Sequence, residues 1–390
     1  MSSRRLRTIA VDPFHSYQDA SGPERIFSFY DPASQMRAVL VIDTTAFGLS
    51  AGGIRMLPDL SLMEIVRLAR AMTYKYLMLE VHCGGAKAGV WYDPTKHDRH
   101  AVWTAFLTAL RPFVEQRMYL PGTDMGTTEE DFQSLHAEGA RQRSGGLLKQ
   151  VSDGLPLEDQ LTGFGVVEAT RVAAEFFGIS MNGASVAIEG FGKVGGGAAR
   201  FFGRSGARIV AVSTIAGTRY DPTGLDVEQL LTLRRTYGDD AVRYYSNGKL
   251  LPCNRLFSLP VDILIPGARP DAITAKNVEK VRAKLIVPGA NIPFTVAIAN
   301  RLSARRIGVV PDFVANGGGV LAALADLQGL DVNAAFRSVR DRISANTKLV
   351  LDYSREHHCT PVDAAIQICQ ERWHQKAAPG RKLVPHSHLM

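Results

Sequence analysis

The feature that most constrains the fold is a glycine-rich segment, residues 190–195 (GFGKVG). It follows a β-branched, apolar run at 184–189 (ASVAIE) that is typical of a buried strand. It also opens a small-residue segment that suits a closely packed helix ending near 202. In this setting a G-x-G-x-x-G segment indicates dinucleotide binding rather than a purely structural turn, because the backbone can approach a pyrophosphate at a helix N-terminus. The residues expected to bind the cofactor here are Gly190, Gly192, Lys193, Val194 and Gly195.

Further strands after this segment predict the sheet to which it belongs. Apolar runs at 207–213, 261–265 and 285–287 alternate with helical segments, and proline or glycine closes the later ones. This order predicts an α/β fold with a Rossmann-like, doubly wound parallel sheet. Because 390 residues are long for one domain, we expect two. The expected division is an N-terminal α/β substrate and catalytic domain (1–145), a dinucleotide-binding domain (146–328), and C-terminal helices (329–390) that pack back on the first domain.

The end of the second strand leaves the choice between NAD and NADP open. An acidic residue at this position holds the ribose of NAD, but the strand ends in Ser213 and Thr214, which we expect to contact the cofactor. Asp221 lies further along the chain. Neutral hydroxyls with Arg219 nearby would tolerate a 2′-phosphate, so the sequence is compatible with either cofactor.

The first half of the chain contains strand and helix signals that place three polar residues. Residues 36–43 (MRAVLVID) form a strand signal, and a capping box at 61–64 (SLME) predicts a helix that carries Lys75 near its end. A second helix is expected over 101–115, where Pro112 would kink or shorten it. Asp124 stands just before hydroxyl and acidic residues typical of a helix start, so we expect it on a strand-to-helix loop.

Lys75, Lys87 and Asp124 stand in short segments with unusual surroundings: 72–75 (MTYK), 84–87 (GGAK) and 124–128 (DMGTT). We interpret the last two as glycine-marked turns. Each residue also has a simple structural interpretation, as a helix-end lysine, a loop lysine or a helix-start aspartate. If the three converge, however, they favour catalysis on a small anionic substrate, because a lysine removed from water becomes a usable base near neutral pH.

Composition argues against several other classes of protein. The net charge is +7, but the basic residues are scattered and dense only at 4–7 and around Arg301, Arg305 and Arg306, so nucleic-acid binding is not favoured. The four cysteines form no C-x-x-C pair, and we expect no metal site. We find neither a secretory signal nor an apolar stretch long enough to span a membrane, which favours a cytoplasmic protein.

Taken together, these motifs resemble the glutamate/leucine/phenylalanine/valine dehydrogenase family over most of the chain. The three segments around Lys75, Lys87 and Asp124 are similar to the family's two lysine motifs and its D-V-G-T-T motif, in the same order. Other segments resemble its G-G-x-R-M turn, its T-x-x-G-V segment, its E-G-A-N turn and its P-D-x-x-x-N-x-G-G-V segment; in this chain they are 52–56, 162–166, 288–291 and 311–320.

The resemblance implies reversible oxidative deamination of an L-amino acid to a 2-oxo acid and ammonia, with NAD or NADP as cofactor. It implies that Lys75 binds the substrate α-carboxylate, that Lys87 activates water and that Asp124 moves protons to and from the substrate nitrogen. It also implies a homo-oligomer. Further residues expected at the cofactor are Thr162, Ala268, Asn291 and Asn316, and those expected at the substrate are Ala51, Gly52, Gly53, Met72, Gly122 and Ala323.

Two positions concern the choice of amino acid. Glutamate-specific members of the family carry a lysine where this chain has Ala51, and a serine where it has Ala323. A site without those partners would leave a second carboxylate buried and unpaired. We therefore expect an apolar substrate, branched-chain or aromatic, and a pattern closest to the leucine, phenylalanine and valine members. The alternatives are a glutamate dehydrogenase and a dinucleotide-binding paralogue with weak or no catalysis.

Overall fold

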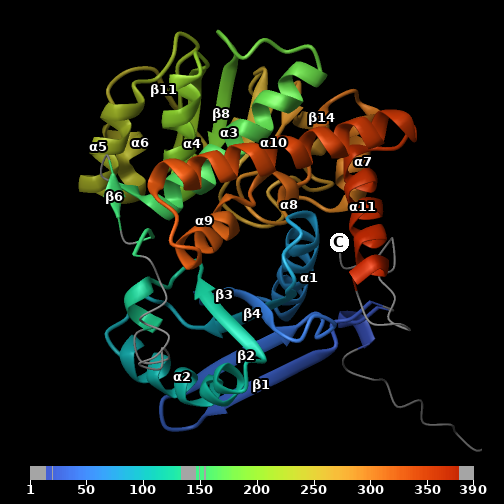
Figure 1. Ribbon diagram of the computed structural model, residues 1–390. Coiled ribbons are helices and arrows are strands. Elements are labelled where there is room, and N and C mark those ends of the chain that lie inside the picture. Colours follow the sequence, from blue (N-terminus) through green and yellow to red (C-terminus); the bar gives the residue numbers. More distant parts are fainter. Residues whose placement is uncertain (1–14, 20, 133–145, 149, 153–154, 377–390) are drawn as a thin grey trace, which may run out of the picture. The chain divides into compact units, whose positions relative to one another are not determined.

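The computed structural model describes residues 15–376, except for 20, 133–145, 149 and 153–154 (Figure 1). The chain divides into two compact units. The first comprises Met1–Thr73, Cys83–Asp131 and Trp373–Met390, and the second comprises Tyr74–His82 and Phe132–Arg372. Each unit has its own sheet, and the expected two-part α/β fold is confirmed. The division expected at 145 and 328 stays a prediction.

The first unit is built on a five-stranded sheet of order β1-β2-β4-β3-β5. Its strands are β1 (Arg25–Asp31), β2 (Met36–Ile42), β3 (Ser50–Leu57), β4 (Gly84–Trp91) and β5 (Tyr119–Thr123), and its main helices are α1 (Leu62–Met78) and α2 (Arg99–Glu115). Strands β4, β3 and β5 run parallel, whereas β1 and β2 pair antiparallel at one edge. The carboxyl ends of β3 and β5 therefore open on the same edge of the sheet.

Helix α1 begins where the capping box predicts, because the Glu64 N–H donates to Ser61 Oγ over 3.1 Å. Its apolar side packs on the sheet in a buried cluster of Val39, Val41, Leu60, Ile65, Val66 and Ala69. Helix α2 covers the other face, where the Phe106 ring meets the Phe29 ring of β1 edge-on at 6.3 Å. Phe29 is paired with Ala38 of β2. Side chains alternate between the two faces along a strand, so Ala38 and Phe29 lie on the face opposite to Val39, which packs with α1.

The two glycine pairs interpreted as turns, at 52–56 and 84–87, lie instead within strands β3 and β4. The prediction of turns was wrong because glycine in a strand can also mark close approach of another backbone. A Cβ on Gly52 would lie 1.7 Å from a carbonyl oxygen of β4, and one on Gly85 would lie 2.2 Å from the carbonyl oxygen of Ala69 on α1. These glycines let strand and helix backbones pack in contact.

The second unit contains a seven-stranded sheet of order β11-β10-β9-β8-β12-β13-β14, and a two-stranded hairpin of β6 and β7. The strands are β6 (Val151–Ser152), β7 (Leu155–Pro156), β8 (Ser185–Glu189), β9 (Arg208–Thr214), β10 (Gly217–Tyr220), β11 (Lys249–Leu251), β12 (Ile263–Pro266), β13 (Leu285–Ile286) and β14 (Gly308–Val309). The five neighbouring strands β9, β8, β12, β13 and β14 pair parallel to one another. Strands β10 and β11 add an antiparallel edge next to β9. The chain order reverses direction at β8, which makes its carboxyl end the expected ligand edge.

Nine helices of the second unit are described. They are α3 (Leu157–Phe176), α4 (Lys193–Arg204), α5 (Val227–Tyr237), α6 (Ala241–Tyr244), α7 (Val296–Ala304), α8 (Asp312–Ala315), α9 (Gly318–Leu327), α10 (Val332–Glu356) and α11 (Pro361–Lys376). The last residues of α11 belong to the first unit. The sequence indicates a helix over about 165–177, but α3 begins eight residues earlier, at Leu157, and α2 continues past Pro112 to Glu115. In both cases burial of an apolar face outweighs local signals.

Two sequence features lie wholly or partly outside the described residues. One is the polar, proline-containing segment 377–390, which the sequence indicates as a tail; the other is much of the polar, glycine-rich stretch 141–154, which it indicates as the crossover between domains. Among the helices of the described ranges, none combines the length and apolar character that crossing a bilayer requires.

Candidate active site and dinucleotide-binding loop

In the first unit the structure brings Lys87 and Asp124 together. Lys87 lies on β4, and Asp124 directly follows β5; both strands flank β3, with Ile54 paired to Ala88 on one side and to Thr123 on the other. The Lys87 ammonium forms an ion pair with the Asp124 carboxylate, and the two side chains are only 4% and 14% exposed. A buried pair of this kind marks a candidate site for proton transfer, because burial and a close charged partner shift the pKa values of both groups.

Gly53 on β3 makes room for this pair. A Cβ there would lie 2.7 Å from the Thr123 carbonyl oxygen and 3.2 Å from Lys87 Nζ. The loop that carries Asp124 is held to the sheet by Thr127, whose hydroxyl accepts from the Asp124 N–H at 2.9 Å and lies 3.0 Å from the Ile54 carbonyl oxygen, to which it donates. The position of the carboxylate is therefore fixed by the backbone.

Arg55 and Glu64 complete the cluster and were missed by the sequence analysis as site residues. Arg55 donates from Nε and Nη2 to the two oxygens of Asp124 at 3.2 and 3.3 Å, and from Nη1 to Glu64 at 2.6 Å. The Arg55 side chain is 5% exposed. The available signal was the position of Arg55 in the G-G-x-R-M segment. A buried arginine requires carboxylate partners, so an arginine in that segment indicates acidic side chains close to it.

The electrostatics of the cluster separate the proton affinities of Lys87 and Asp124. Burial lowers the pKa of Lys87, and the charge of Arg55 lowers it further, while Asp124 opposes both. Burial acts to raise the pKa of Asp124, but Arg55 and Lys87 overcome it and hold that pKa well below its usual range. Asp124 thus stays ionised, while Lys87 has a weakened hold on its proton.

In the second unit the structure brings Lys75 together with Asn291 and Asn316. Lys75 is buried near the end of α1, and its Nζ donates to Asn291 Oδ1 at 2.8 Å. Asn316 Nδ2 donates to the same oxygen at 3.0 Å. Lys75, Asn291 and Asn316 therefore form one hydrogen-bonded group in the second unit. The predicted residues Lys87 and Asp124 form a separate pair in the first unit.

The end of α1 is firmly fixed within the second unit. The Tyr74 ring stacks on Phe313 with centroids 5.3 Å apart, and Asn346 donates to the Met78 carbonyl oxygen at 2.9 Å. Asp312, which the sequence analysis missed, accepts from the backbone at 2.7 Å; burial raises its pKa, although the Lys75 charge opposes this. The ammonium of Lys75 is therefore held by its neighbours in a defined place.

The residues at 190–195 fit a dinucleotide. Gly190 has φ +79°, and a Cβ on Gly195 would lie 1.8 Å from the Gly190 carbonyl oxygen, so both must be glycine. Nothing lies within 4 Å of a Cβ built on Gly192, which leaves open space above the loop. Helix α4 begins at Lys193 with no side-chain cap, so its first N–H groups face this space. The Oδ1 of Asn316 is buried and has no hydrogen-bond partner among the described residues.

Glu189 carries a partly buried carboxyl at the start of this loop. Its Oε2 accepts from the Ala268 N–H at 3.4 Å. Burial raises the pKa of Glu189 to about 7, although the backbone N–H groups of Ala268 and Gly267 oppose the rise. Ala268, expected at the cofactor, thus lies at the carboxyl end of the neighbouring strand β12, beside the loop.

The remaining predicted residues have the following places. In the first unit, Gly52 and the buried Ala51 lie on β3, Gly122 lies on β5 and the buried Met72 lies on α1. In the second unit, Thr162 lies on α3, Val194 on α4, the exposed Ala323 on α9, and Ser213 and Thr214 end β9. Among the described residues, no three histidine, cysteine, aspartate or glutamate side chains group as a metal site requires.

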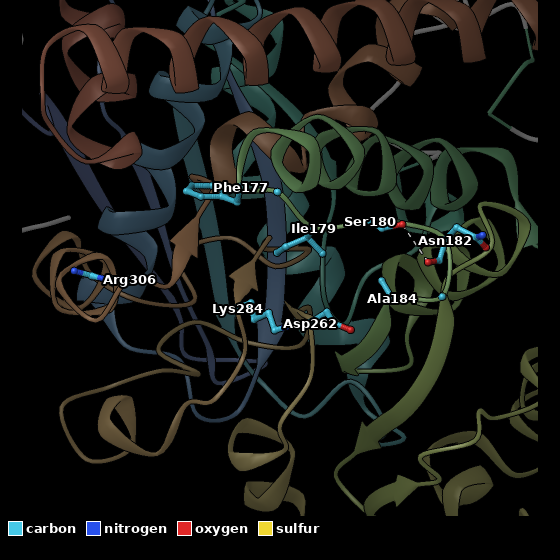
Figure 2. A pocket seen from close by; sticks show the side chains of 10 residues that line it. Phe177, Ile179, Ser180, Asn182, Ala184, Asp262, Lys284 and Arg306 are labelled. Carbon is cyan, nitrogen blue, oxygen red and sulfur yellow. Dashed lines mark hydrogen bonds and ion pairs between the residues drawn. The ribbon is translucent and has the colours of Figure 1, made fainter.

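A hollow of about 510 Å³ lies elsewhere on the second unit (Figure 2). Its lining includes Asn182, Asp262 and Lys284, which precede strands β8, β12 and β13. It is therefore at the amino ends of the strands, opposite to the glycine-rich loop. Asp262 is bound to Ser185 at 2.7 Å and to Lys284 at 2.8 Å, so these polar groups serve the structure. No predicted site residue lines this hollow.

Comparison with known proteins gives two adjacent family matches. Residues 154–378 match the model of glutamate/leucine/phenylalanine/valine dehydrogenase, and residues 23–140 match the model of the Glu/Leu/Phe/Val dehydrogenase dimerisation domain. Glutamate dehydrogenase of Aeropyrum pernix is 32% identical over 84% of this chain and 82% of its own length. The NADP(+)-dependent glutamate dehydrogenase of Pyrobaculum calidifontis is 30% identical over 92% of both. Other relatives have names that specify NAD in one case and NADP in another.

A solved structure shows the same fold. The hetero-hexameric glutamate dehydrogenase from Thermus thermophilus, in its Leu-bound form, superposes with a TM-score of 0.78 at 22% identity, covering 94% of this chain and 92% of that one. The expectation that the pattern is closest to the leucine, phenylalanine and valine members was wrong, because relatives of 30–35% identity are named glutamate dehydrogenases. That expectation relied on a few positions, whereas identity is spread along the whole chain.

Proposed function

Because the chain belongs to the glutamate/leucine/phenylalanine/valine dehydrogenase family and is an amino-acid dehydrogenase that uses NAD or NADP, we propose that it catalyses the reversible oxidative deamination of L-glutamate to the 2-oxo acid and ammonia. The names of its relatives support this substrate. The observation that carries the chemistry is the buried Lys87–Asp124 ion pair beside Gly53.

Lys87 is the proposed catalytic base. Burial lowers the pKa of Lys87, so it can lose its own proton and, as the neutral amine, take a proton from water as the water attacks the imine carbon. Asp124, kept ionised by Arg55, is proposed to accept and return protons at the substrate nitrogen. The bound dinucleotide supplies the hydride acceptor. The residues of this chain orient the reacting carbon, exclude water and move the protons.

Lys75 is proposed to bind the α-carboxylate of the substrate. Its ammonium is buried and donates to the neutral Asn291 at 2.8 Å. A charge-assisted bond from an ammonium to a carboxylate is about twice as strong as a neutral one. The α-carboxylate is present in all amino acids, so this contact would serve any substrate of the family.

An apolar amino acid is the second candidate, and Ala51 favours it. This residue is buried on β3 between Leu120 and Gly85, so its immediate strand neighbours bring no cation. Ala323 likewise contributes no hydroxyl. If these positions face the end of the substrate side chain, as the resemblance implies, a second carboxylate would need another partner.

Initial rates with a panel of L-amino acids, each with NAD and with NADP, test the substrate. Production of reduced cofactor with glutamate, and a kcat/KM at least tenfold above that for leucine, valine, isoleucine and phenylalanine, would support the first candidate. The reverse ratio would refute it in favour of the second. In that case Ala51→Lys is expected to shift the ratio toward glutamate, because it adds the missing cation.

The role of Lys87 is tested by Lys87→Ala. We expect turnover to fall by about 10²–10⁴-fold, the usual contribution of a general base, with dinucleotide binding unchanged. Lys96→Ala is the matched control, since Lys96 is an exposed lysine of the same unit. Equal activity of the two variants would remove Lys87 from catalysis.

We also propose that the protein assembles as a homo-oligomer in the cytoplasm. Support for assembly comes from residues 23–140, which match a dimerisation domain. Sedimentation velocity at micromolar concentration tests the assembly, and a single species at the monomer mass would refute it.

A further inference from the structure

One residue of the second unit has a backbone conformation that its side chain disfavours. Ile292 has φ +47°, in the left-handed region, and Pro293 follows it. A β-branched side chain crowds the backbone in this region, and a residue before proline is normally extended. Strain of this kind persists only where the surrounding structure enforces it, and it is concentrated at functional sites. The groups that hold Ile292 therefore indicate what the strain serves.

Asp312 is the side chain that holds this backbone. It is buried, and its Oδ2 accepts from the Ile292 N–H at 2.7 Å. On the other side of the residue, the Ile292 carbonyl oxygen accepts from the Asp271 N–H at 3.0 Å. Ile292 is itself buried, so loss of the Asp312 acceptor would leave a buried N–H group unpaired. The backbone would then be free to turn toward the extended form.

Helix α8 holds the turn that contains Ile292 from both of its ends. Asp312 begins the helix and Asn316 follows its last residue, with the Asn316 N–H bonded to the Asp312 carbonyl oxygen at 2.9 Å. Asn316 Nδ2 donates to the Gly289 carbonyl oxygen at 3.4 Å and to Asn291 Oδ1 at 3.0 Å. One helical turn thus fixes the backbone and the asparagine side chain of this turn together.

The turn places Asn291 beside Lys75. Asn291 Oδ1 accepts from Lys75 Nζ at 2.8 Å. Asn291 and Ile292 share a planar peptide unit, so a rotation of the backbone at Ile292 displaces Asn291. The Phe313 ring of α8 also stacks on Tyr74, the residue before Lys75, with centroids 5.3 Å apart. Helix α8 therefore contacts both the turn and the end of α1 that carries the ammonium.

The charges of Asp312 and Lys75 lie close enough to act on each other. Burial raises the pKa of Asp312, while the Ile292 N–H and the Lys75 charge oppose the rise. The carboxyl and the ammonium therefore belong to one buried region of the second unit, and Asn291 and Ile292 connect them.

We propose that Asp312 is a positioning residue for the amino-acid substrate: by fixing Ile292 it orients Asn291, and so it holds Lys75 where the α-carboxylate binds. The inference rests on the proposed function, because it requires that Lys75 binds that carboxylate. Asp312 acts here through Asn291 and not on the substrate. Its hydrogen bond to the Ile292 N–H carries the effect, so an uncharged acceptor of the same shape should replace it.

Two substitutions of Asp312 separate its hydrogen bond from its charge, assayed with the amino acid that the substrate panel favours. Asp312→Ala removes the acceptor, and we expect the KM for the amino acid to rise about tenfold or more, the size of one lost hydrogen bond to a charged group, with a smaller change in kcat. Asp312→Asn keeps an oxygen that can accept, and its KM should stay within about threefold of the wild type. A wild-type KM in Asp312→Ala, or equal impairment of both variants, would overturn the proposal.

Asp262→Ala is the matched control for lost stability. Asp262 also accepts from a backbone N–H, that of Ser185 at 2.9 Å, but it does so at the amino ends of the strands. We expect a lower melting temperature in both alanine variants and a raised KM only in Asp312→Ala. A raised KM in both would show a general effect of stability and would overturn the assignment. If Asp312→Ala does not fold, Asn291→Ala decides, because an unchanged KM in that variant would break the proposed link to Lys75.

Lys75→Ala distinguishes failure of this inference from failure of the proposed function. If Lys75 binds the α-carboxylate, its loss raises the KM, and adding Asp312→Ala should raise it by no more than about twofold further, because both residues serve one contact. An unchanged KM in Lys75→Ala would remove the proposed role of Lys75 and the inference with it. A raised KM in Lys75→Ala, with a fully additive effect of Asp312→Ala, would overturn the inference alone.

Discussion

Replacing Glu189 by glutamine should stabilise the protein at alkaline pH. Burial raises the pKa of Glu189 from 4.5 to about 7. Between these values the native state binds more protons than the unfolded state, so the stability of the protein falls as pH rises through this window. The difference between 7 and 4.5, at 1.36 kcal/mol per pH unit, corresponds to about 3 kcal/mol of stability that is lost by pH 8. Glutamine fills the same space without ionising.

Urea unfolding of the wild type and of Glu189→Gln at pH 5 and pH 8 measures this effect. The variant should gain roughly 2–3 kcal/mol over the wild type between the two pH values, because most of the cost of ionising Glu189 arises above pH 5. Glu175→Gln, on the exposed side of α3, is the control and should show no comparable change with pH. If the stability difference for Glu189→Gln is the same at both pH values, the carboxyl does not titrate near 7 and the reasoning is refuted.

Two further substitutions test the geometry of the first unit. Gly53→Ala places a methyl group 2.7 Å from a backbone oxygen and 3.2 Å from Lys87 Nζ, so we expect a loss of about 1–3 kcal/mol in unfolding free energy and a lower kcat; a wild-type melting temperature would contradict the close contact. Asp124→Asn removes the charge that supports protonation of Lys87, so the pKa of Lys87 should fall further. The acidic limb of the kcat/KM profile should then move to lower pH, and an unmoved limb in a variant with residual activity would separate that limb from Lys87.

The sequence predicted the elements that depend on local signals. The capping box at Ser61 and the glycine-rich loop after β8 each determine the local backbone conformation, and both are found as expected. The glycine pairs of β3 and β4 were misread, because a glycine needed for flexibility and a glycine needed for close packing look alike in a sequence. Only the tertiary packing, which sets Gly85 of β4 against Ala69 of helix α1, distinguishes them.

The side-chain partners were the least predictable part of the site. Arg55 lies in a segment that was recognised, but its bonds to Asp124 and Glu64 join residues 69 and nine positions away. Arg219 is near Thr214 in the sequence, whereas in the structure its guanidinium donates to backbone carbonyl oxygens. Whether a cation is available to a ligand depends on such tertiary contacts, which leave no periodic pattern in the chain.

Arg55 explains how one ion pair can support two different proton-transfer roles. Lys87 and Asp124 alone, buried in a medium of low dielectric constant, could neutralise each other by moving the proton from nitrogen to carboxylate. Arg55 opposes that transfer, because its permanent charge and two hydrogen bonds stabilise the ionised carboxylate and also weaken the hold of Lys87 on its proton. Glu64 balances the added charge at 2.6 Å. Arg55 therefore keeps the proton of Lys87 from settling on Asp124, so the carboxylate holds a proton only in passing, and Lys87 must lose its own proton elsewhere before it acts as a base.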